Sequence, residues 1–246
     1  MIDAHAHFLP NIDDGAKSVD ESLAMLREAY KQGVRLCVAT PHAVIHDNDE
    51  INRFINNRKI AYQKLQSQMP SNSIDIPKIL LGAEVYLDND INQYRDIVKL
   101  CIENSNAMLI EFPLTHKFNH KAEEWIYELC CKKINPIIAH IERYAFRNEM
   151  LEALIDIPTV YQINSSVFKT IHGRAFLKKA LKTNKQVIVS SDMHNMKKRK
   201  CNLQASYTKA SKLFEQAENL FEINAKKILN IQENNMRKYN YVQAIF

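Results

Sequence analysis

The feature that most constrains the fold is a regular alternation of short apolar runs with longer amphipathic segments. The seven strand-like runs are residues 1–5, 34–40, 79–85, 107–112, 136–140, 159–164 and 186–191. The sequence shows no internal repeat, low-complexity stretch or break in composition. Strands that alternate with helices predict a parallel α/β fold, and the alternation alone allows either a barrel or a doubly wound sheet.

The clearest helix signal is Ser18-Val19-Asp20-Glu21, a capping-box pattern that begins a helix through Tyr30. The other helix-like segments are residues 50–68, 119–132, 148–155 and 174–183, with one or two more helices between residues 203 and 231. The polar tail, residues 234–246, ends in apolar residues, and we expect it to fray or to form an oligomer contact. A length of 246 residues suits one barrel domain, so we expect a single domain over residues 1–246.

A metal-competent side chain stands at or just beyond the carboxyl end of each predicted strand. These residues are His5, His7, Asp14, His42, Glu84, Glu111, His140, Asn164, Asp192 and His194. The carboxyl ends of the strands of a parallel barrel meet at one rim, so we expect these side chains to lie together. Each residue alone could be a structural histidine, an ion-pair partner or a turn residue, and Asp13 is interpreted as a turn residue. Their joint occurrence on buried strands favours a site.

Imidazole mixed with carboxylates suits Zn, Mn or Fe rather than Ca. Without Asn164, the five histidines and four carboxylates make nine candidate ligands. Nine ligands exceed the needs of one ion, so we expect two or three ions that share bridging carboxylates. Closely spaced ions can share a hydroxide nucleophile and neutralise a phosphate group. The predicted reaction is therefore hydrolysis of a phosphate ester.

Composition narrows the remaining classes. The net charge of +5 suits an anionic substrate, and no aromatic pattern for base stacking accompanies it, so we expect no nucleic-acid partner. No apolar run approaches the ~18 residues of a membrane span, and no signal peptide is recognised. The five cysteines have no CxxC spacing and an odd count. We therefore expect a soluble, cytoplasmic protein with reduced thiols.

Eight stretches of the chain, spread from residue 1 to about residue 199, resemble one known family. They are 1–7 (MIDAHAH), 12–18 (IDDGAKS), 39–42 (ATPH), 82–86 (GAEVY), 109–112 (LIEF), 138–144 (IAHIERY), 162–166 (QINSS) and 191–195 (SDMHN). The family is the PHP (polymerase and histidinol phosphatase) superfamily. More narrowly, the chain resembles its manganese-dependent protein-tyrosine phosphatases, which are encoded with bacterial capsule and exopolysaccharide genes. The His-x-His motif alone is shared with amidohydrolases, whereas the Asp-Asp-Gly and His-Ile-Glu-Arg-Tyr segments together are specific.

The resemblance implies a distorted (β/α)7 barrel with a trinuclear site. It implies that His5, His7, Glu84 and Asp192 hold one ion, that Glu84 bridges to a second ion completed by Glu111 and His140, and that Asp14, His42 and His194 hold the third. The resemblance also matches Arg143 and Arg199 to arginines that clamp the substrate phosphate. A guanidinium suits that task because its planar fork binds two oxygens, although the position of Arg199 within a Lys-Lys-Arg-Lys run leaves its register open.

The implied substrate is phosphotyrosine on a protein, such as a cognate tyrosine kinase that regulates polysaccharide export. The implied metal is Mn, with Fe, Zn, Co or Mg as alternatives. Asp192 or His42 would protonate the leaving phenolate, and no Cys-x5-Arg loop of the thiol phosphatases is present. Three alternatives stay open: a histidinol-phosphate phosphatase, a non-catalytic metal-stabilised module, and a phosphodiesterase or nuclease.

Overall fold

The computed structural model describes residues 1–69, 75–114, 117–183 and 186–232, and its strands are all parallel. The strands are β1 (Ile2–Ala6), β2 (Leu36–Ala39), β3 (His42–Val44), β4 (Lys78–Leu81), β5 (Glu84–Tyr86), β6 (Ala107–Glu111), β7 (Asn135–Ile138), β8 (Val160–Asn164) and β9 (Gln186–Ser190). The helices are α1 (Val19–Lys31), α2 (Asn48–Ser67), α3 (His120–Cys131), α4 (Arg147–Ala153), α5 (Ile171–Leu181), α6 (Leu203–Ser211) and α7 (Asn224–Ile228). The predicted parallel α/β fold is confirmed.

The strands form two parallel sheets, in the orders β1-β2-β4 and β3-β5-β6-β7-β8-β9. Because β3 follows β2 and β5 follows β4 along the chain, the two sheets are continuous on one side. On the other side β1 lies beside the end of β9, where Asp192 N donates to His5 O at 2.9 Å and His7 N donates to Met193 O at 2.8 Å. This arrangement of two sheets that meet at both edges is compatible with a distorted seven-stranded barrel.

The strands are broken at two places, each immediately before a candidate ligand. The predicted strand over residues 79–85 is in fact β4 and β5, separated by Gly82 and Ala83, and β3 was not predicted at all. Pro41, which has no N–H for the sheet, lies between β2 and β3. A Cβ atom at Gly82 would lie 2.9 Å from the Ile102 side chain, so the second break requires glycine. The first break lies directly before His42 and the second directly before Glu84.

Helix boundaries follow local capping. Ser18 caps α1 as predicted, and its side chain accepts a hydrogen bond from Glu21 N. α5 begins at Ile171, earlier than the predicted residue 174, because Thr170 acts as the cap and accepts from Gly173 N. The predicted tail over residues 234–246 lies outside the described residues.

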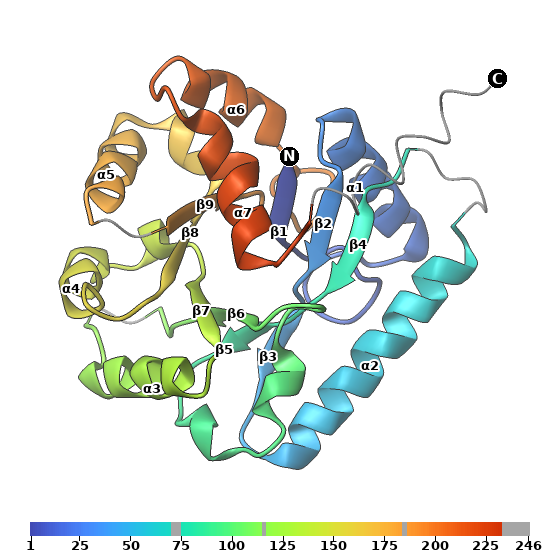
Figure 1. The fold of residues 1–246 in the computed structure, drawn as a ribbon. Helices are drawn as coiled ribbons and strands as arrows, with labels where there is room; N and C mark the ends of the chain where they lie inside the picture. Colours follow the sequence, from blue (N-terminus) through green and yellow to red (C-terminus); the bar gives the residue numbers. More distant parts are fainter. Residues whose placement is uncertain (70–74, 115–116, 184–185, 233–246) are drawn as a thin grey trace.

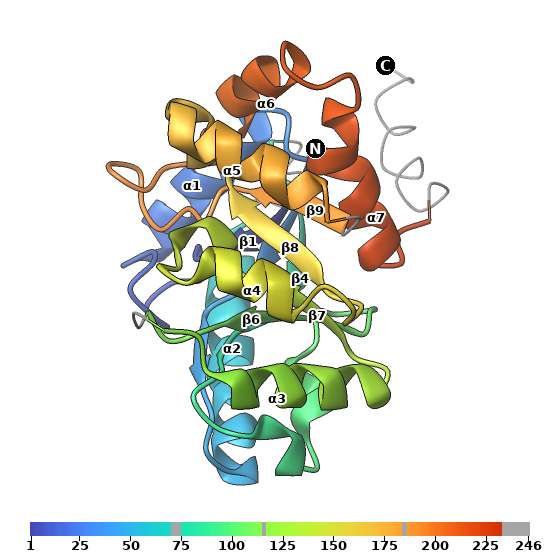
Figure 2. The same cartoon turned by 90° about the vertical axis from the view of Figure 1, so that its left-hand side faces the viewer.

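The helices lie around the strands, and α3, α4 and α5 cover the outer side of β7 to β9 (Figures 1 and 2). The core has two parts. A larger apolar cluster packs the strands against the helices, and a smaller one gathers residues such as Ala4, Val38, Leu109 and Ile188 with α7. α7 lies across one end of the strand assembly (Figure 1), which leaves the carboxyl ends of the strands as the place for a site. None of the described helices is long and apolar enough to cross a membrane.

Candidate metal centre

All nine predicted ligands meet at the carboxyl ends of the strands. Donor atoms of His5, His7 and Glu84 lie within 4.8 Å of one another, as do those of His7, Asp14, His42 and His194, and those of His42, Glu84 and Glu111. His140 and Asp192 join these groups through contacts with Glu84 and His5, respectively. Residues that span most of the sequence thus converge on one cluster of donor atoms, as the strand-end pattern predicted.

His5 and His7 face each other in a way that calls for a cation. Their Nε2 atoms are 3.1 Å apart. His5 Nδ1 lies 3.0 Å from Gln162 Oε1, and His7 Nδ1 lies 2.7 Å from Asp13 Oδ2. Both partners are acceptors, so each Nδ1 carries the hydrogen and each Nε2 of the neutral ring presents a lone pair. Two lone pairs directed at one point are the arrangement of two ligands to one metal ion.

Glu84 is the centre of the cluster and is 1% exposed. Its Oε1 lies 3.0 Å from His140 Nε2 and 3.2 Å from His5 Nε2. Its Oε2 lies 3.1 Å from His7 Nε2 and 3.0 Å from His42 Nδ1. Despite these distances, Oε2 has no aligned hydrogen bond. A buried carboxylate oxygen surrounded by nitrogens but not hydrogen bonded is oriented as a metal ligand rather than as an ordinary acceptor.

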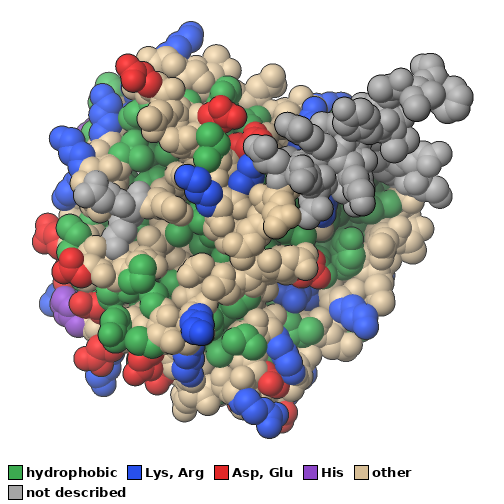
Figure 3. All heavy atoms as spheres, viewed as in Figure 1, with side chains coloured by type: hydrophobic (Ala, Val, Ile, Leu, Met, Phe, Trp, Pro, Cys, Tyr) green, Lys and Arg blue, Asp and Glu red, His purple; other side chains and the backbone are tan. Residues whose placement is uncertain are grey.

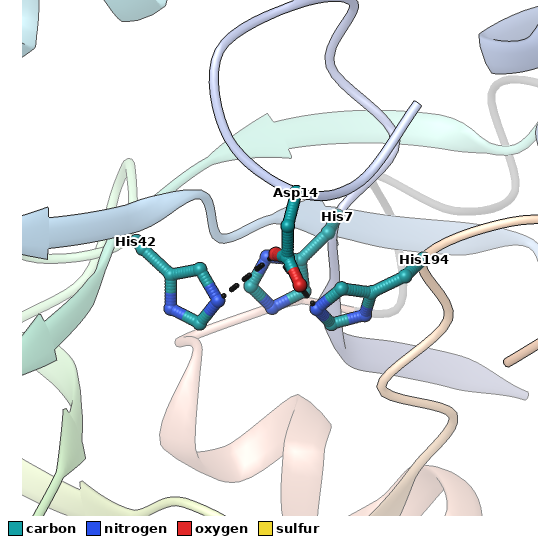
Figure 4. A group of neighbouring side chains, drawn as sticks. All are labelled: His7, Asp14, His42 and His194. Atoms are coloured by element: carbon teal, nitrogen blue, oxygen red, sulfur yellow. Dashed lines mark ion pairs between the residues drawn. The ribbon is translucent and has the colours of Figure 1, made fainter. Parts of the chain in front are cut away.

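The outer part of the site is formed by Asp14, His42 and His194, beside His7 (Figure 4). Asp14 Oδ1 lies 3.2 Å from His42 Nε2 and 3.3 Å from His194 Nε2. His194 Nδ1 faces the Asp192 carbonyl oxygen at 3.0 Å, so Nδ1 carries the hydrogen. His194 Nε2 therefore has a lone pair available for a metal ion. That buried Nε2 also lacks a hydrogen bond. The loop carboxylate therefore closes a third set of potential ligands.

Glu111 and Asp192 complete the set from opposite sides. Glu111 Oε1 lies 3.3 Å from His140 Nε2, and Asp192 Oδ1 lies 3.5 Å from His5 Nε2. His140 and Asp192 adopt φ angles of 29° and 53°. Such left-handed conformations are uncommon for residues with a side chain and mark positions that the surrounding structure must hold.

The electrostatics of the site indicate a demand for positive charge. Burial opposes protonation of His5, but the carboxylates of Glu84 and Asp192 outweigh it and raise the pKa of His5 to about 10. Burial likewise opposes protonation of His42, yet contacts with Glu84 and Glu111 raise its pKa to about 9. Despite burial, the surrounding histidines lower the pKa of Glu84. Divalent ions would satisfy the same carboxylates and displace those protons.

The donor set and its spacing fit divalent transition-metal ions. Two atoms that each lie about 2.1 Å from one ion stand roughly 3 to 3.4 Å apart in tetrahedral or octahedral geometry. Most of the contacts described above have that separation. In three of the histidines, Nδ1 carries the hydrogen and Nε2 faces the other candidate ligands. His5, His7 and His194 are thus oriented to bind, and the carboxylates supply bridging atoms.

Both predicted arginines reach the same edge of the site. Arg199 donates through Nη2 to both oxygens of Asp192, at 2.9 and 2.8 Å. Arg143 Nη1 lies 3.6 Å from Asp192 Oδ2. Both arginines are partly buried, with side chains that are 37% exposed. The neighbouring Lys197, Lys198 and Lys200 lie on the exposed surface. Within the basic run, Arg199 is therefore the residue whose cation adjoins the candidate ligands.

Two residues of the site were not recognised from the sequence. Asp13 does form the predicted turn, since its Oδ1 accepts from Gly15 N at 2.8 Å, but its other oxygen also orients His7. Burial opposes ionisation of Asp13, yet hydrogen bonds from His7 and Gly15 lower its pKa to about 2. Gln162 orients His5, and its only sequence signal was its place two residues before the end of a predicted strand.

Three of the five cysteines are unsuited to act as a competing nucleophile. All five are free thiols. Burial raises the pKa of Cys101 to about 11 and raises the pKa values of Cys37 and Cys201 as well. A reactive cysteine needs a lowered pKa and access to solvent, so these three are inert, apolar positions.

Comparisons with known proteins give the site a family. Residues 1–230 match the family described as "Capsular polysaccharide synthesis, CpsB/CapC". The chain is 35% identical over 211 residues to tyrosine-protein phosphatase YwqE of Bacillus subtilis, covering 81% of this chain and 79% of the relative. It is 32% identical over 249 residues to tyrosine-protein phosphatase CpsB of Streptococcus agalactiae, covering 93% and 98%.

One solved structure extends the comparison to three dimensions. It comes from work described as crystal structures of YwqE from Bacillus subtilis and CpsB from Streptococcus pneumoniae, "unique metal-dependent tyrosine phosphatases". It aligns with a TM-score of 0.76 and 28% identity, over 94% of this chain and 95% of that chain. The likeness therefore extends over nearly the whole fold.

Proposed function

The chain belongs to the capsular polysaccharide synthesis family CpsB/CapC, and from this premise we propose that it is a metal-dependent tyrosine-protein phosphatase. The observation that carries the proposal is the buried Glu84, whose Oε2 has no hydrogen bond although it lies 3.1 Å from His7 Nε2 and 3.0 Å from His42 Nδ1. Arg143 and Arg199 lie beside Asp192 of the same cluster. Such a cluster suits phosphate ester hydrolysis, because phosphoryl transfer depends chiefly on positioning and on neutralising charge.

The proposed ions divide the ligands into three sets. His5, His7, Glu84 and Asp192 would hold the first ion, and Glu84, Glu111 and His140 would hold the second. Asp14, His42 and His194 hold the third. We propose Mn as the metal, with Fe, Zn, Co or Mg as substitutes. When bound, the ions supply a hydroxide nucleophile at neutral pH and neutralise the phosphate oxygens.

The protein's own residues bind the phosphate and assist the leaving group. Arg143 and Arg199 clamp two phosphoryl oxygens with their planar forks, and Arg199 exchanges its contact with Asp192 for the substrate. His42 suits protonation of the leaving phenolate better than Asp192. Its side chain is 36% exposed, whereas both oxygens of Asp192 already accept hydrogen bonds. Phenolate is a good leaving group, so this step contributes modestly.

The substrate we propose is phosphotyrosine on a protein, and the partner is a cognate tyrosine kinase of a capsule or exopolysaccharide system. We further propose that residues 1–246 form one domain and that the protein acts in the cytoplasm. On the face shown in Figure 3, basic and acidic side chains are interspersed rather than gathered by sign. That face therefore offers no broad basic surface of the kind that binds nucleic acid.

The first test is hydrolysis of a phosphotyrosine peptide with added Mn or with chelator, run beside histidinol phosphate. We expect Mn-dependent release from the peptide and little from histidinol phosphate. Preference for histidinol phosphate would instead indicate an enzyme of amino-acid metabolism that uses the same metal site. His42→Ala and Asp192→Ala should abolish most activity, whereas Cys131→Ser should not. The reverse pattern would contradict the metal mechanism.

A further inference from the structure

One strand reaches the metal centre without supplying a ligand to the proposed ions. β8 ends at Asn164, and its two amide side chains, Gln162 and Asn164, are 0% and 8% exposed. They lie two residues apart and so share one face of the strand. A buried amide must find partners for both its donor and its acceptor. The partners of these two amides are the candidate ligands and each other.

The direction of the hydrogen bonds is set by one backbone group. His140 N donates to Gln162 Oε1 at 2.6 Å. A backbone N–H can only donate, so the Gln162 oxygen must point toward His140. The same oxygen lies 3.0 Å from His5 Nδ1, which must then carry its hydrogen. His5 Nε2 is thereby left as the lone-pair atom that faces the other candidate ligands.

The other end of Gln162 reaches a third ligand. Gln162 Nε2 donates to Asn164 Oδ1 at 2.9 Å, and Asn164 Nδ2 donates to Asp192 Oδ2 at 2.8 Å. Two of the residues held in this way, His140 and Asp192, have left-handed backbone conformations. Such conformations persist only where surrounding contacts hold them.

We propose that Gln162 is a positioning residue for the metal centre. It holds His5 in the tautomer that offers Nε2 to an ion, anchors the backbone of His140 and, through Asn164, orients the carboxylate of Asp192. This inference rests on the metal sites of the proposed function. An amide can orient these ligands without adding charge. A carboxylate in its place would be repelled by Glu84, Glu111 and Asp192.

The principal test is Gln162→Met, which keeps the volume and removes both hydrogen-bonding groups. Mn binding to the metal-free protein is measured by calorimetric titration, and bound Mn is counted after desalting. We expect the variant to bind Mn roughly tenfold to hundredfold more weakly, as is usual when the partner of a ligating histidine is lost. The matched control is Asn92→Leu, which removes another buried amide, one that donates to Asp90 and Trp125. The control should lose stability but bind Mn as the wild type does.

A double-mutant cycle with Asn164→Ala tests the chain of hydrogen bonds itself. Because both amides act in series on Asp192, the double variant should lose less Mn affinity than the two single losses combined. Additive losses, or a Gln162→Met variant with wild-type affinity, would overturn the proposal. If Gln162→Met does not fold, Asn164→Ala alone tests the proposal, because it removes the hydrogen bond to Asp192 Oδ2 and should bind Mn more weakly than the wild type. Wild-type Mn affinity in Asn164→Ala would also overturn the proposal. Failure of the wild type to bind Mn would instead overturn the proposed function on which this inference rests.

Discussion

The inner and outer parts of the candidate metal centre are held in different ways. The inner group is His5, His7, Glu84, His140 and Asp192, whose side chains are at most 4% exposed. The outer group is Asp14, His42 and Glu111, whose side chains are 60%, 36% and 13% exposed. His194, which is 1% exposed, lies between the two groups and contacts both Asp14 and Asp192. In the inner group, Gln162 orients His5 and holds the backbone of His140, Asp13 orients His7, and Asn164 orients Asp192. Among the described residues, the Asp14 carboxylate contacts only His42, His194 and Arg199 of the site itself.

This difference separates two tasks. Ligands that are oriented by further hydrogen bonds bind an ion with little loss of conformational freedom, so the inner group should bind metal tightly. The outer ligands are the ones that border solvent, and Asp14 also lies 3.7 Å from Arg199, so the substrate phosphate must enter on this side. We therefore expect the inner group to govern stability and the outer group to govern turnover.

The largest effect should follow from Glu84→Gln, because Glu84 contacts four histidines at the boundary of the two groups. Losing the bridge removes stabilisation of several kcal/mol from the transition state, or roughly a thousandfold in activity. Bound Mn should fall in the same variant. Glu222→Gln, a half-buried carboxylate that pairs with Lys226, is the control and should behave as the wild type. A Glu84→Gln protein with its full Mn content would refute the central role of this residue.

His42→Ala should sharpen the comparison by separating activity from stability. We expect activity to fall roughly a hundredfold, about 2.7 kcal/mol, because one outer ion loses a ligand. The rise in melting temperature on adding Mn should be largely retained, since the inner ligands are untouched. Thermal unfolding with Mn or chelator measures this rise. If His42→Ala loses it as completely as Glu84→Gln does, the two groups are not distinct.

Reloading the metal-free protein should restore stability before activity. Ligands with supporting partners bind metal about tenfold or more tightly than ligands without them. Half of the Mn-induced stabilisation should therefore appear at a roughly tenfold lower Mn concentration than half of the activity. The measurement is a Mn titration of chelator-treated protein, read in parallel by thermal unfolding and by peptide hydrolysis. Coincident curves would mean that the ions bind as one cooperative unit.

The smallest effects should arise at the basic edge. Arg143→Lys keeps the charge but loses one of two hydrogen bonds, so kcat/KM for a phosphotyrosine peptide should fall about fivefold, mainly through KM. The exposed Lys198 has no such fork, and Lys198→Ala should change kcat/KM by less than about twofold. Equal losses in the two variants would point to a general attraction for anions rather than to a clamp.

Much of the fold and of the ligand set could be predicted from local patterns. Apolar runs of strand length, each with His, Asp, Glu or Asn at or just beyond its end, indicated both the parallel strands and the rim at which the side chains meet. The capping signal at Ser18 gave the start of α1 correctly, because a cap depends on residues within one turn. The break between β4 and β5 was missed, because it depends on the contact of Gly82 with Ile102, a residue outside the local pattern.

The sequence by itself determined which residue types reach the site, since side chains alternate along a strand and charged groups are costly on buried strands. It could not determine which nitrogen of each histidine faces the ions. That choice depends on partners far away along the chain, such as Gln162, which is 157 residues from His5. Asp13 shows the same limit: its neighbours in sequence make it a turn residue, and only the approach of His7 makes it an orienting acceptor. Ring orientation is a matter of distance and direction in space, and only the tertiary structure decided it.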